Sequence, residues 1–340
     1  MGVLRTWYRI LNGTYDARSE PVGSLDLVSR WLIATRSVVF VMTVNSVIIG
    51  GLLYVLYDRS AASPGLLLLL ALVVLGLVAA HGASNLFNDY WDAKHGIDTS
   101  EGYFRPAYMP HPSLSGMMSS DSLFALGLAH LLVMVAIAAY LVMLRGPAVL
   151  AFAGLGVFFI IAYAGGPHPL KRVGLGEPAV FLVWGPLMVG GTFYVLAGTL
   201  PAWVIVASLP YAVSVTTVLF GKHIDKIDYD VKLGVKTVPV ILGEAATKRA
   251  LKALIVVAYA AVVGLVATRY LPVWALFSLL ALPKAGQLFR ALDNPRPKEA
   301  PPGAVAWPIW YLGFVFGHNR RFGALYILGL ILCCALPLYV

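Results

Sequence analysis

One short segment gathers side chains whose types and spacing could hold a metal ion. Residues 85 to 98 read NLFNDYWDAKHGID and directly follow a strongly apolar stretch. Asn85, Asn88, Asp89 and Asp92 stand at i, i+3, i+4 and i+7, so on a helix they share one face. Ionised side chains at membrane depth are costly unless they face a cavity, a partner or a metal. The spacing predicts a stripe of oxygen ligands at the end of a helix, with Asp98 outside the stripe.

A second acidic segment lies far away along the chain. Residues 220 to 237 read FGKHIDKIDYDVKLGVKT and contain Asp225, Asp228 and Asp230 among several lysines. Mg²⁺ prefers oxygen ligands and commonly joins carboxylates to the phosphates of a substrate. If both acidic segments meet at one face of the molecule, they would suit a pair of Mg²⁺ ions that hold a diphosphate.

The composition indicates which elements position these segments. Hydrophobic residues make up 59% of the 340 residues and charged residues only 12%, about half of what a soluble domain carries. A membrane-spanning helix needs roughly 20 mostly apolar residues. The sequence predicts an all-α, polytopic membrane protein with about nine spans in one bundle, near residues 30–57, 64–91, 122–144, 147–164, 177–197, 201–222, 250–268, 271–290 and 322–340.

The distribution of Lys and Arg predicts the orientation of these spans. With a cytoplasmic N-terminus, the outer connections hold only Arg59, Arg145 and Arg269 of 25 basic residues. Both acidic segments then emerge on the cytoplasmic side, where we expect the active-site cavity to open. We expect one domain over 1–340, with 1–28 as a cytoplasmic segment. The net charge of +9 reflects this bias, and no nucleic-acid-binding motif is present, so we expect no nucleic-acid partner.

Three stretches together resemble a known family. NLFNDYWDAKHGID resembles the first signature, Asn-x-x-x-Asp-x-x-Asp, of the UbiA superfamily of intramembrane prenyltransferases. DKIDYDVKLGVKT resembles its second Asp-rich signature, with the Gly-x-x-Thr/Ser element at Gly234 to Thr237. Residues 163–195, YAGGPHPLKRVGLGEPAVFLVWGPLMVGGTFYV, are similar to a stretch of the MenA-type branch, which prenylates 1,4-dihydroxy-2-naphthoate.

The chain departs from the family pattern in both signatures. The second normally has two acids four residues apart, and Asp230 fills the later place while Lys226 occupies the earlier one. Either Asp225 or Asp228 could then accompany Asp230. After the first signature the chain lacks the Arg-Pro pair of the branch that makes archaeal ether lipids or chlorophyll, and is closer to the naphthoate branch.

The resemblance implies Mg²⁺-dependent transfer of a prenyl group from a polyprenyl diphosphate to a small aromatic acceptor, in a membrane. Ionisation of the diphosphate to an allylic cation would precede attack by the acceptor. It implies the following roles: metal ligands Asn85, Asp89, Asp92, Asp225, Asp228 and Asp230; diphosphate contacts Lys171, Arg172 and Lys222; catalytic groups Asp89, Asp92, Lys171 and Tyr163; and additional site residues Asn88, Asp98 and Arg105.

Other functions remain open at this stage. A hydroxybenzoate, another quinone precursor, or a lipid or sugar phosphate could replace dihydroxynaphthoate as the acceptor. A membrane transporter is the main alternative from another class, because intramembrane acids are also typical of transporters. Transporter sites lie near the midplane, however, whereas these acids gather at one face, which favours the prenyltransferase.

Overall fold

The computed structural model of the chain is a bundle of helices. It describes residues 2–59, 64–99, 109–302, 304 and 307–339, and the structural statements below concern these residues. Within them the backbone forms no β-strand, only an isolated bridge between Val173 and Lys236. The predicted all-α class is confirmed.

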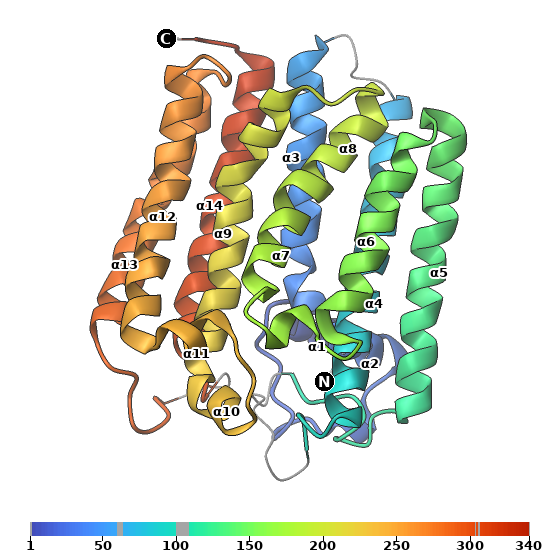
Figure 1. Cartoon of the computed structure of the whole chain (residues 1–340), viewed down its shortest axis with the longest axis vertical. Helices are drawn as coiled ribbons and strands as arrows, with labels where there is room; N and C mark the ends of the chain where they lie inside the picture. The colour runs from blue at the N-terminus through green and yellow to red at the C-terminus, as the bar shows by residue number, and fades with distance from the viewer. Residues whose placement is uncertain (1, 60–63, 100–108, 303, 305–306, 340) are drawn as a thin grey trace.

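Long helices run side by side along the long axis of the molecule, and short ones gather at one end (Figure 1). The two chain ends lie at opposite ends of the bundle, the N-terminus among the short helices. In chain order the elements are α1 (Val3–Leu11), η1 (Val22–Ser24), α2 (Leu27–Ala34), η2 (Ser37–Val39), α3 (Phe40–Tyr57), α4 (Pro64–Lys94), α5 (Ser120–Arg145), α6 (Ala148–Ala164), η4 (Leu170–Arg172), α7 (Gly176–Leu182), η5 (Val183–Leu187), α8 (Met188–Ala197), α9 (Ala202–Asp225), α10 (Ile227–Lys232), α11 (Val238–Leu242), α12 (Glu244–Ala267), η6 (Val273–Ala281), α13 (Leu282–Asp293) and α14 (Tyr311–Ala335).

Several of these helices are long and apolar enough to cross a membrane. Among the described residues six meet both criteria: Ser37–Tyr57, Gly65–Lys94, Ser120–Arg145, Gly176–Ala197, Ala202–Asp225 and Glu244–Ala267. The apolar helix Ala148–Ala164 is shorter. Nine spans therefore stays a prediction.

Three of the expected spans have different boundaries in the structure. The span expected at 30–57 is interrupted at Thr35 and Arg36, between α2 and η2. The span expected at 271–290 begins as the 3₁₀ helix η6 before it continues as α13. The last helix begins at Tyr311, well before the expected residue 322. The polar residues His318 to Arg321 lie inside this helix and lower its mean hydropathy there. Hydropathy alone misplaced that boundary.

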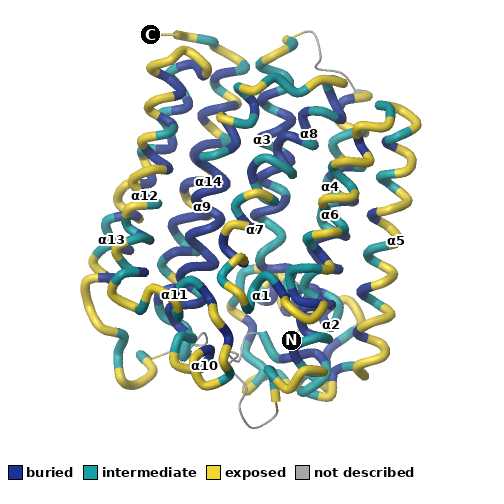
Figure 2. The backbone as a smooth tube through the Cα atoms, in the orientation of Figure 1, coloured by how far each residue is buried: buried dark blue, intermediate teal, exposed yellow. Residues whose placement is uncertain are grey.

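Burial separates the centre of the bundle from its periphery (Figure 2). In α9, 83% of the most apolar window is buried, whereas in α5 the value is 17%. Large apolar side chains of α5, such as Leu132 and Met143, are exposed instead. A soluble protein rarely exposes such a surface, but lipid tails would cover it.

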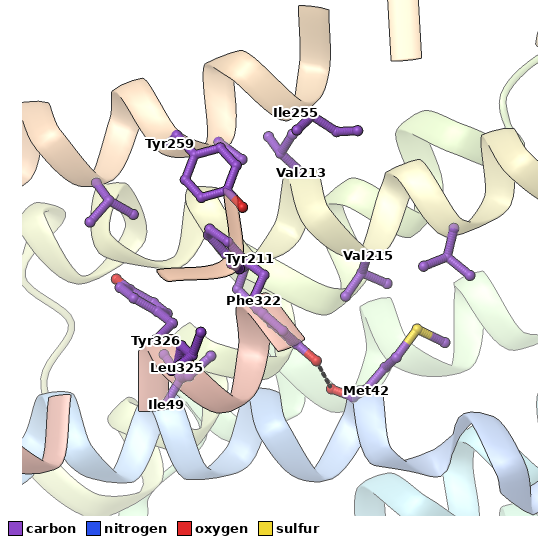
Figure 3. Packing of buried hydrophobic residues seen from close by; sticks show 14 of the residues in the cluster. Met42, Ile49, Tyr211, Val213, Val215, Ile255, Tyr259, Phe322, Leu325 and Tyr326 are labelled. Atoms are coloured by element: carbon purple, nitrogen blue, oxygen red, sulfur yellow. Dashed lines mark hydrogen bonds between the residues drawn. The ribbon is translucent and has the colours of Figure 1, made fainter. Parts of the chain in front are cut away.

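The largest hydrophobic cluster joins α3, α9, α12 and α14 (Figure 3). Tyr211 of α9 is fully buried there, and its hydroxyl donates a hydrogen bond to the carbonyl oxygen of Met42 in α3. The hydroxyl of Tyr326 in α14 donates a hydrogen bond to the carbonyl oxygen of Ala207 in α9. These tyrosines join the helices through polar atoms that would otherwise be buried without a partner.

The first helix lies across the end of the bundle rather than within it. Its Ile10 packs in a small cluster with Tyr15, Leu25 and Leu32. Its opposite side exposes Leu4, 75% accessible, together with Tyr8 and Leu11, four and seven residues farther along. A helix that is buried on one side and apolar on its exposed side is suited to the membrane interface.

The close contact of α14 with η6 depends on one glycine. A Cβ atom on Gly329 would lie 2.4 Å from the carbonyl oxygen of Trp274, whereas one on Gly317 would meet nothing within 4 Å. We expect Gly329→Ala to lower stability by about 1–3 kcal/mol because the backbones must separate. Thermal unfolding in detergent measures this. Gly317→Ala in the same helix is the control and should leave the midpoint equal or higher. Equal midpoints for both variants would contradict the packing.

Candidate active site

The site begins at the helix break between α2 and η2. Thr35 ends α2, and its carbonyl oxygen accepts a hydrogen bond of 2.9 Å from the side-chain amide of Asn85 in α4. Arg36 follows with a left-handed backbone (φ 55°), a conformation that costs energy in a residue other than glycine. The break turns the chain so that the Arg36 side chain lies beside α4.

Arg36 is ion-paired with Asp89, the central acid of the predicted stripe. The Asp89 side chain is fully buried and Arg36 keeps only 13% of its side-chain surface. A buried carboxylate needs such a partner because the low-dielectric interior solvates charge poorly. Arg36 therefore supplies the positive charge that balances Asp89. The high mean hydropathy of residues 30–57 gave no indication of this role.

Asn88 and Asp92 of the stripe face the basic loop between α6 and α7. Lys171 Nζ donates hydrogen bonds of 2.6 Å both to Asn88 Oδ1 and to Asp92 Oδ2. Arg172 donates a bond of 3.1 Å to Asp92 Oδ1. Burial lowers the pKa of Lys171, and the neighbouring Asp92 carboxylate opposes that shift. Two of the three predicted diphosphate contacts, Lys171 and Arg172, thus lie against the predicted metal ligand Asp92.

Asp98 lies close to the stripe in the structure, although the helical spacing placed it outside the stripe. The chain curls back after α4, and the backbone N–H groups of Ile97 and Asp98 both donate to the carbonyl oxygen of Asp92. Ligand atoms of Asp89, Asp98 and His111 then lie within 4.8 Å of one another. Carboxylate oxygens with an imidazole nitrogen are a donor set that fits a divalent cation.

The three acids of the second acidic segment lie in different surroundings. Asp225 accepts hydrogen bonds of 2.9 Å from the backbone N–H groups of Tyr311 and Leu312 and so caps α14. Asp228 is exposed. Asp230 is fully buried and ion-paired with Lys226 at 3.0 Å, and neither of its oxygens accepts a hydrogen bond from the described residues. Of the three acids, only Asp230 combines burial with oxygens that a cation could use.

Direct contacts connect the two acidic segments. Tyr229, next to Asp230, donates a hydrogen bond of 2.5 Å to the carbonyl oxygen of Ile97. Burial, with a smaller contribution from the Asp98 carboxylate, raises the pKa of Tyr229 to about 12, so the hydroxyl keeps its proton. The backbone N–H of Lys236 donates to the carbonyl oxygen of Arg172 in the basic loop. All three predicted motifs therefore meet at one end of the bundle.

A cavity of about 350 Å³ runs from this polar end toward the opposite end of the bundle. Its polar end is lined by Arg36, Asn85, Asn88, Asp92, Asp98, Lys222 and Lys226. Its far end is lined by apolar residues where α5, α6 and α8 approach one another, among them Leu141, Val149 and Val195. Tyr163, the predicted catalytic tyrosine, lines the cavity as well. The shape suits a molecule with one highly charged end and a long apolar remainder.

Several residues of this site were not predicted. Arg36 and Lys226 pair with the predicted acids, and His111 joins Asp89 and Asp98. A basic residue inside an apolar window was the available signal for Arg36, because such a charge needs a partner. The described residues that line the cavity do not include the other predicted acids and bases: Asp89, Asp225, Asp228, Asp230, Lys171 and Arg172. Arg105 lies outside the described residues.

Comparison with known proteins identifies the family. The UbiA prenyltransferase family model matches residues 43–304. The chain belongs to the UbiA prenyltransferase family. UbiA members are membrane proteins, in agreement with the long apolar helices here. Both acidic signatures and the basic loop fall inside the matched range.

Two UbiA relatives illustrate the similarity in sequence. The 1,4-dihydroxy-2-naphthoate octaprenyltransferase of Bacillus subtilis is 30% identical over 206 residues, which are 60% of this chain and 65% of that protein. The match thus spans slightly less than two thirds of the Bacillus protein. UbiA prenyltransferase domain-containing protein 1 of Danio rerio is 29% identical over 272 residues, 78% of this chain and 77% of that protein.

Solved structures of UbiA homologues share the fold. The apo structure from Aeropyrum pernix K1 superposes with a TM-score of 0.58 at 18% identity, over 85% of this chain and 97% of that one. The homologue from Archaeoglobus fulgidus bound to DMAPP and Mg²⁺ gives a TM-score of 0.52 at 16% identity, over 90% and 99%.

The burial of the acids predicts which of them binds a cation. We expect Asp230→Asn to weaken Mn²⁺ binding at least tenfold in the presence of a prenyl diphosphate, because it removes a charge from a buried position. Asp228→Asn, two residues away and exposed, is the matched control and should change the affinity less than twofold. Electron paramagnetic resonance of free Mn²⁺ measures both. A larger effect of Asp228→Asn would contradict this assignment.

Proposed function

We propose that the chain transfers a prenyl group from a polyprenyl diphosphate to 1,4-dihydroxy-2-naphthoate, with Mg²⁺ as cofactor. One observation carries the proposal: acids and bases of three UbiA motifs line the polar end of a long apolar cavity or form ion pairs with residues that line it. A prenyl diphosphate has the same distribution of charge and apolar length.

In this proposal, carboxylates and bases act on opposite charges of the substrate complex. A bound Mg²⁺ would supply the positive charge that neutralises the diphosphate and stabilises it as it leaves. Asp89, Asp92 and Asp230, with the side-chain oxygen of Asn85, would hold this ion. Lys171 and Arg172 turn from Asp92 toward the diphosphate oxygens, with which an arginine can make paired hydrogen bonds. Stabilising charge on the leaving group provides most of the rate acceleration.

The apolar part of the cavity has its own role in the reaction. It holds the isoprenoid chain and keeps water from the allylic cation, which water would convert to an alcohol. The ring of Tyr163 lines the cavity, where an aromatic face can stabilise a nearby cation. A site at one end of the bundle lets the diphosphate enter from water while the chain stays in an apolar environment.

The acceptor assignment has a narrower basis. It is supported by the similarity of residues 163–195 to the naphthoate branch and by the Bacillus relative named for that acceptor. We further propose nine spans in one domain, with the N-terminus and the site loops facing the cytoplasm. The N-terminal segment lies at the same end of the bundle as the site (Figure 1), and the excess of Lys and Arg in the connections predicted on that side supports this orientation.

The function can be tested with purified protein in lipid nanodiscs. We expect labelled prenyl transfer to 1,4-dihydroxy-2-naphthoate in the presence of Mg²⁺, and loss of transfer when EDTA is added. Lys171→Met should lower kcat by about 10²–10³-fold, the usual loss when one charge-stabilising group is removed. Lys232→Met, at an exposed lysine of α10, is the control, because Lys171 contacts Asn88 and Asp92 whereas Lys232 is exposed.

Each part of the proposal can fail separately. Transfer to 4-hydroxybenzoate without transfer to the naphthoate would reject the acceptor and keep the prenyltransferase. Full activity in EDTA would reject the metal. No release of diphosphate with any acceptor would reject the enzyme class.

A further inference from the structure

The polar stripe of α4 continues one turn deeper into the cavity than its signature does. His81 stands four residues before Asn85, on the same helical face, and is only 6% exposed. It lines the same cavity. Its Nδ1 lies 2.8 Å from Thr43 Oγ1 of α3. Its other ring nitrogen, Nε2, has no hydrogen-bond partner among the described residues.

A second polar atom without a partner lies next to this histidine. The centroids of the Trp184 and His81 rings lie 5.0 Å apart, and the angle between the ring planes is 82°. Trp184 lines the cavity too, and its Nε1 is a buried donor for which the described residues provide no acceptor. Buried donors in folded proteins are nearly always paired, so an unpaired one indicates a ligand or water.

The local backbone holds Trp184 in this position. Trp184 belongs to η5, a π-helical turn that contains Pro186, and such turns are frequent at functional sites. Ser46 of α3 donates a hydrogen bond of 2.8 Å to the carbonyl oxygen of Trp184. Thr43 and Ser46 lie three residues apart on α3, so one face of that helix fixes both the imidazole and the indole.

We propose that His81 and Trp184 bind a hydroxyl group of the aromatic acceptor, an inference that rests on the prenyl transfer proposed above. In the tautomer that we propose, His81 Nδ1–H donates the hydrogen bond to Thr43 Oγ1, which leaves Nε2 as an acceptor. The acceptor hydroxyl then donates to His81 Nε2 and accepts from the indole N–H of Trp184. Both groups act in binding and positioning, without a proton transfer.

The location fits a ring that must meet the first carbon of the prenyl chain. At a rise of 1.5 Å per residue, His81 lies about 12 Å along α4 from Asp89 and about 6 Å from Asn85. An acceptor held there lies between the diphosphate site and the apolar part of the cavity. Phe40, whose ring lies 5.3 Å from that of His81, provides an apolar wall beside it.

The experiment compares an acceptor with and without its hydroxyl groups. Equilibrium dialysis under reducing conditions measures binding of 1,4-dihydroxy-2-naphthoate and of its 1,4-dimethoxy ether to the full-length protein in nanodiscs. We expect the wild type to bind the dihydroxy compound about tenfold more tightly, the usual effect of a buried hydrogen bond. Trp184→Phe, which keeps an aromatic ring, should lose most of that preference.

Two substitutions of His81 separate the two ring nitrogens. His81→Asn keeps a polar group near the Nδ1 position and its bond to Thr43, but removes Nε2, and should abolish the preference. His81→Gln places a polar group near Nε2 and should retain it in large part. In turnover, His81→Asn should raise the KM of the acceptor about tenfold and leave the KM of the prenyl diphosphate within twofold.

His318 provides the control, since it is a fully buried histidine that bonds Tyr259 and lies outside the cavity lining. His318→Asn should keep the preference for the dihydroxy compound. If His81→Asn and Trp184→Phe also keep it, the inference is wrong even where transfer by the wild type upholds the proposed function. If the wild type transfers to another hydroxylated ring instead, that compound and its methyl ether serve as the pair.

Discussion

Buried charge at one end of the bundle is the constraint on which the rest of the structure depends. Asp89, Asp92 and Asp230 are each at most 7% exposed. Leaving one such charge without its partner costs about 3–5 kcal/mol. The helix break at Arg36, the basic loop with Lys171, and α10 with Lys226 each bring a cation to one of these acids. Each of these three segments thus places a positive charge beside a buried carboxylate.

The same pairing prepares the site for a charged ligand. Each carboxylate that now neutralises a base can bind a cation, and each base released in this way can bind a phosphate oxygen. In the proposed reaction, a diphosphate with its metal would exchange these partners without leaving a buried charge uncompensated. The apolar cavity begins directly beside this polar end. In the proposed reaction, charge separation therefore occurs at the boundary between a polar and a dry environment.

The sequence predicted the parts that follow from periodicity. The stripe of Asn85, Asn88, Asp89 and Asp92 and the all-α fold depend on helical spacing and hydropathy, and the structure has both. Predictions that depended on tertiary contacts were less complete. Asp98 reaches Asp89 through a return of the chain, and helical spacing cannot show such a return.

The misplaced start of the last helix also explains why the role of Asp225 was left open. Hydropathy placed the start of the last helix at residue 322, but α14 starts at Tyr311. A helix start leaves backbone N–H groups without partners. Asp225 accepts hydrogen bonds from two of them, at Tyr311 and Leu312. Because that boundary was misplaced, nothing in the sequence separated Asp225 from Asp230 as a metal ligand. Arg36 was missed for a related reason, since averaging over an apolar window conceals one charge.

The central claim is that the acids of both signatures hold divalent metal against a diphosphate. Crystals grown with Mn²⁺ and a non-cleavable prenyl thiodiphosphate would test it through anomalous scattering. The account predicts manganese peaks at ligand distance from Asp89 or Asp92 and from Asp230, with the diphosphate between them and the chain in the apolar cavity. A bound diphosphate with no manganese beside these carboxylates would contradict it.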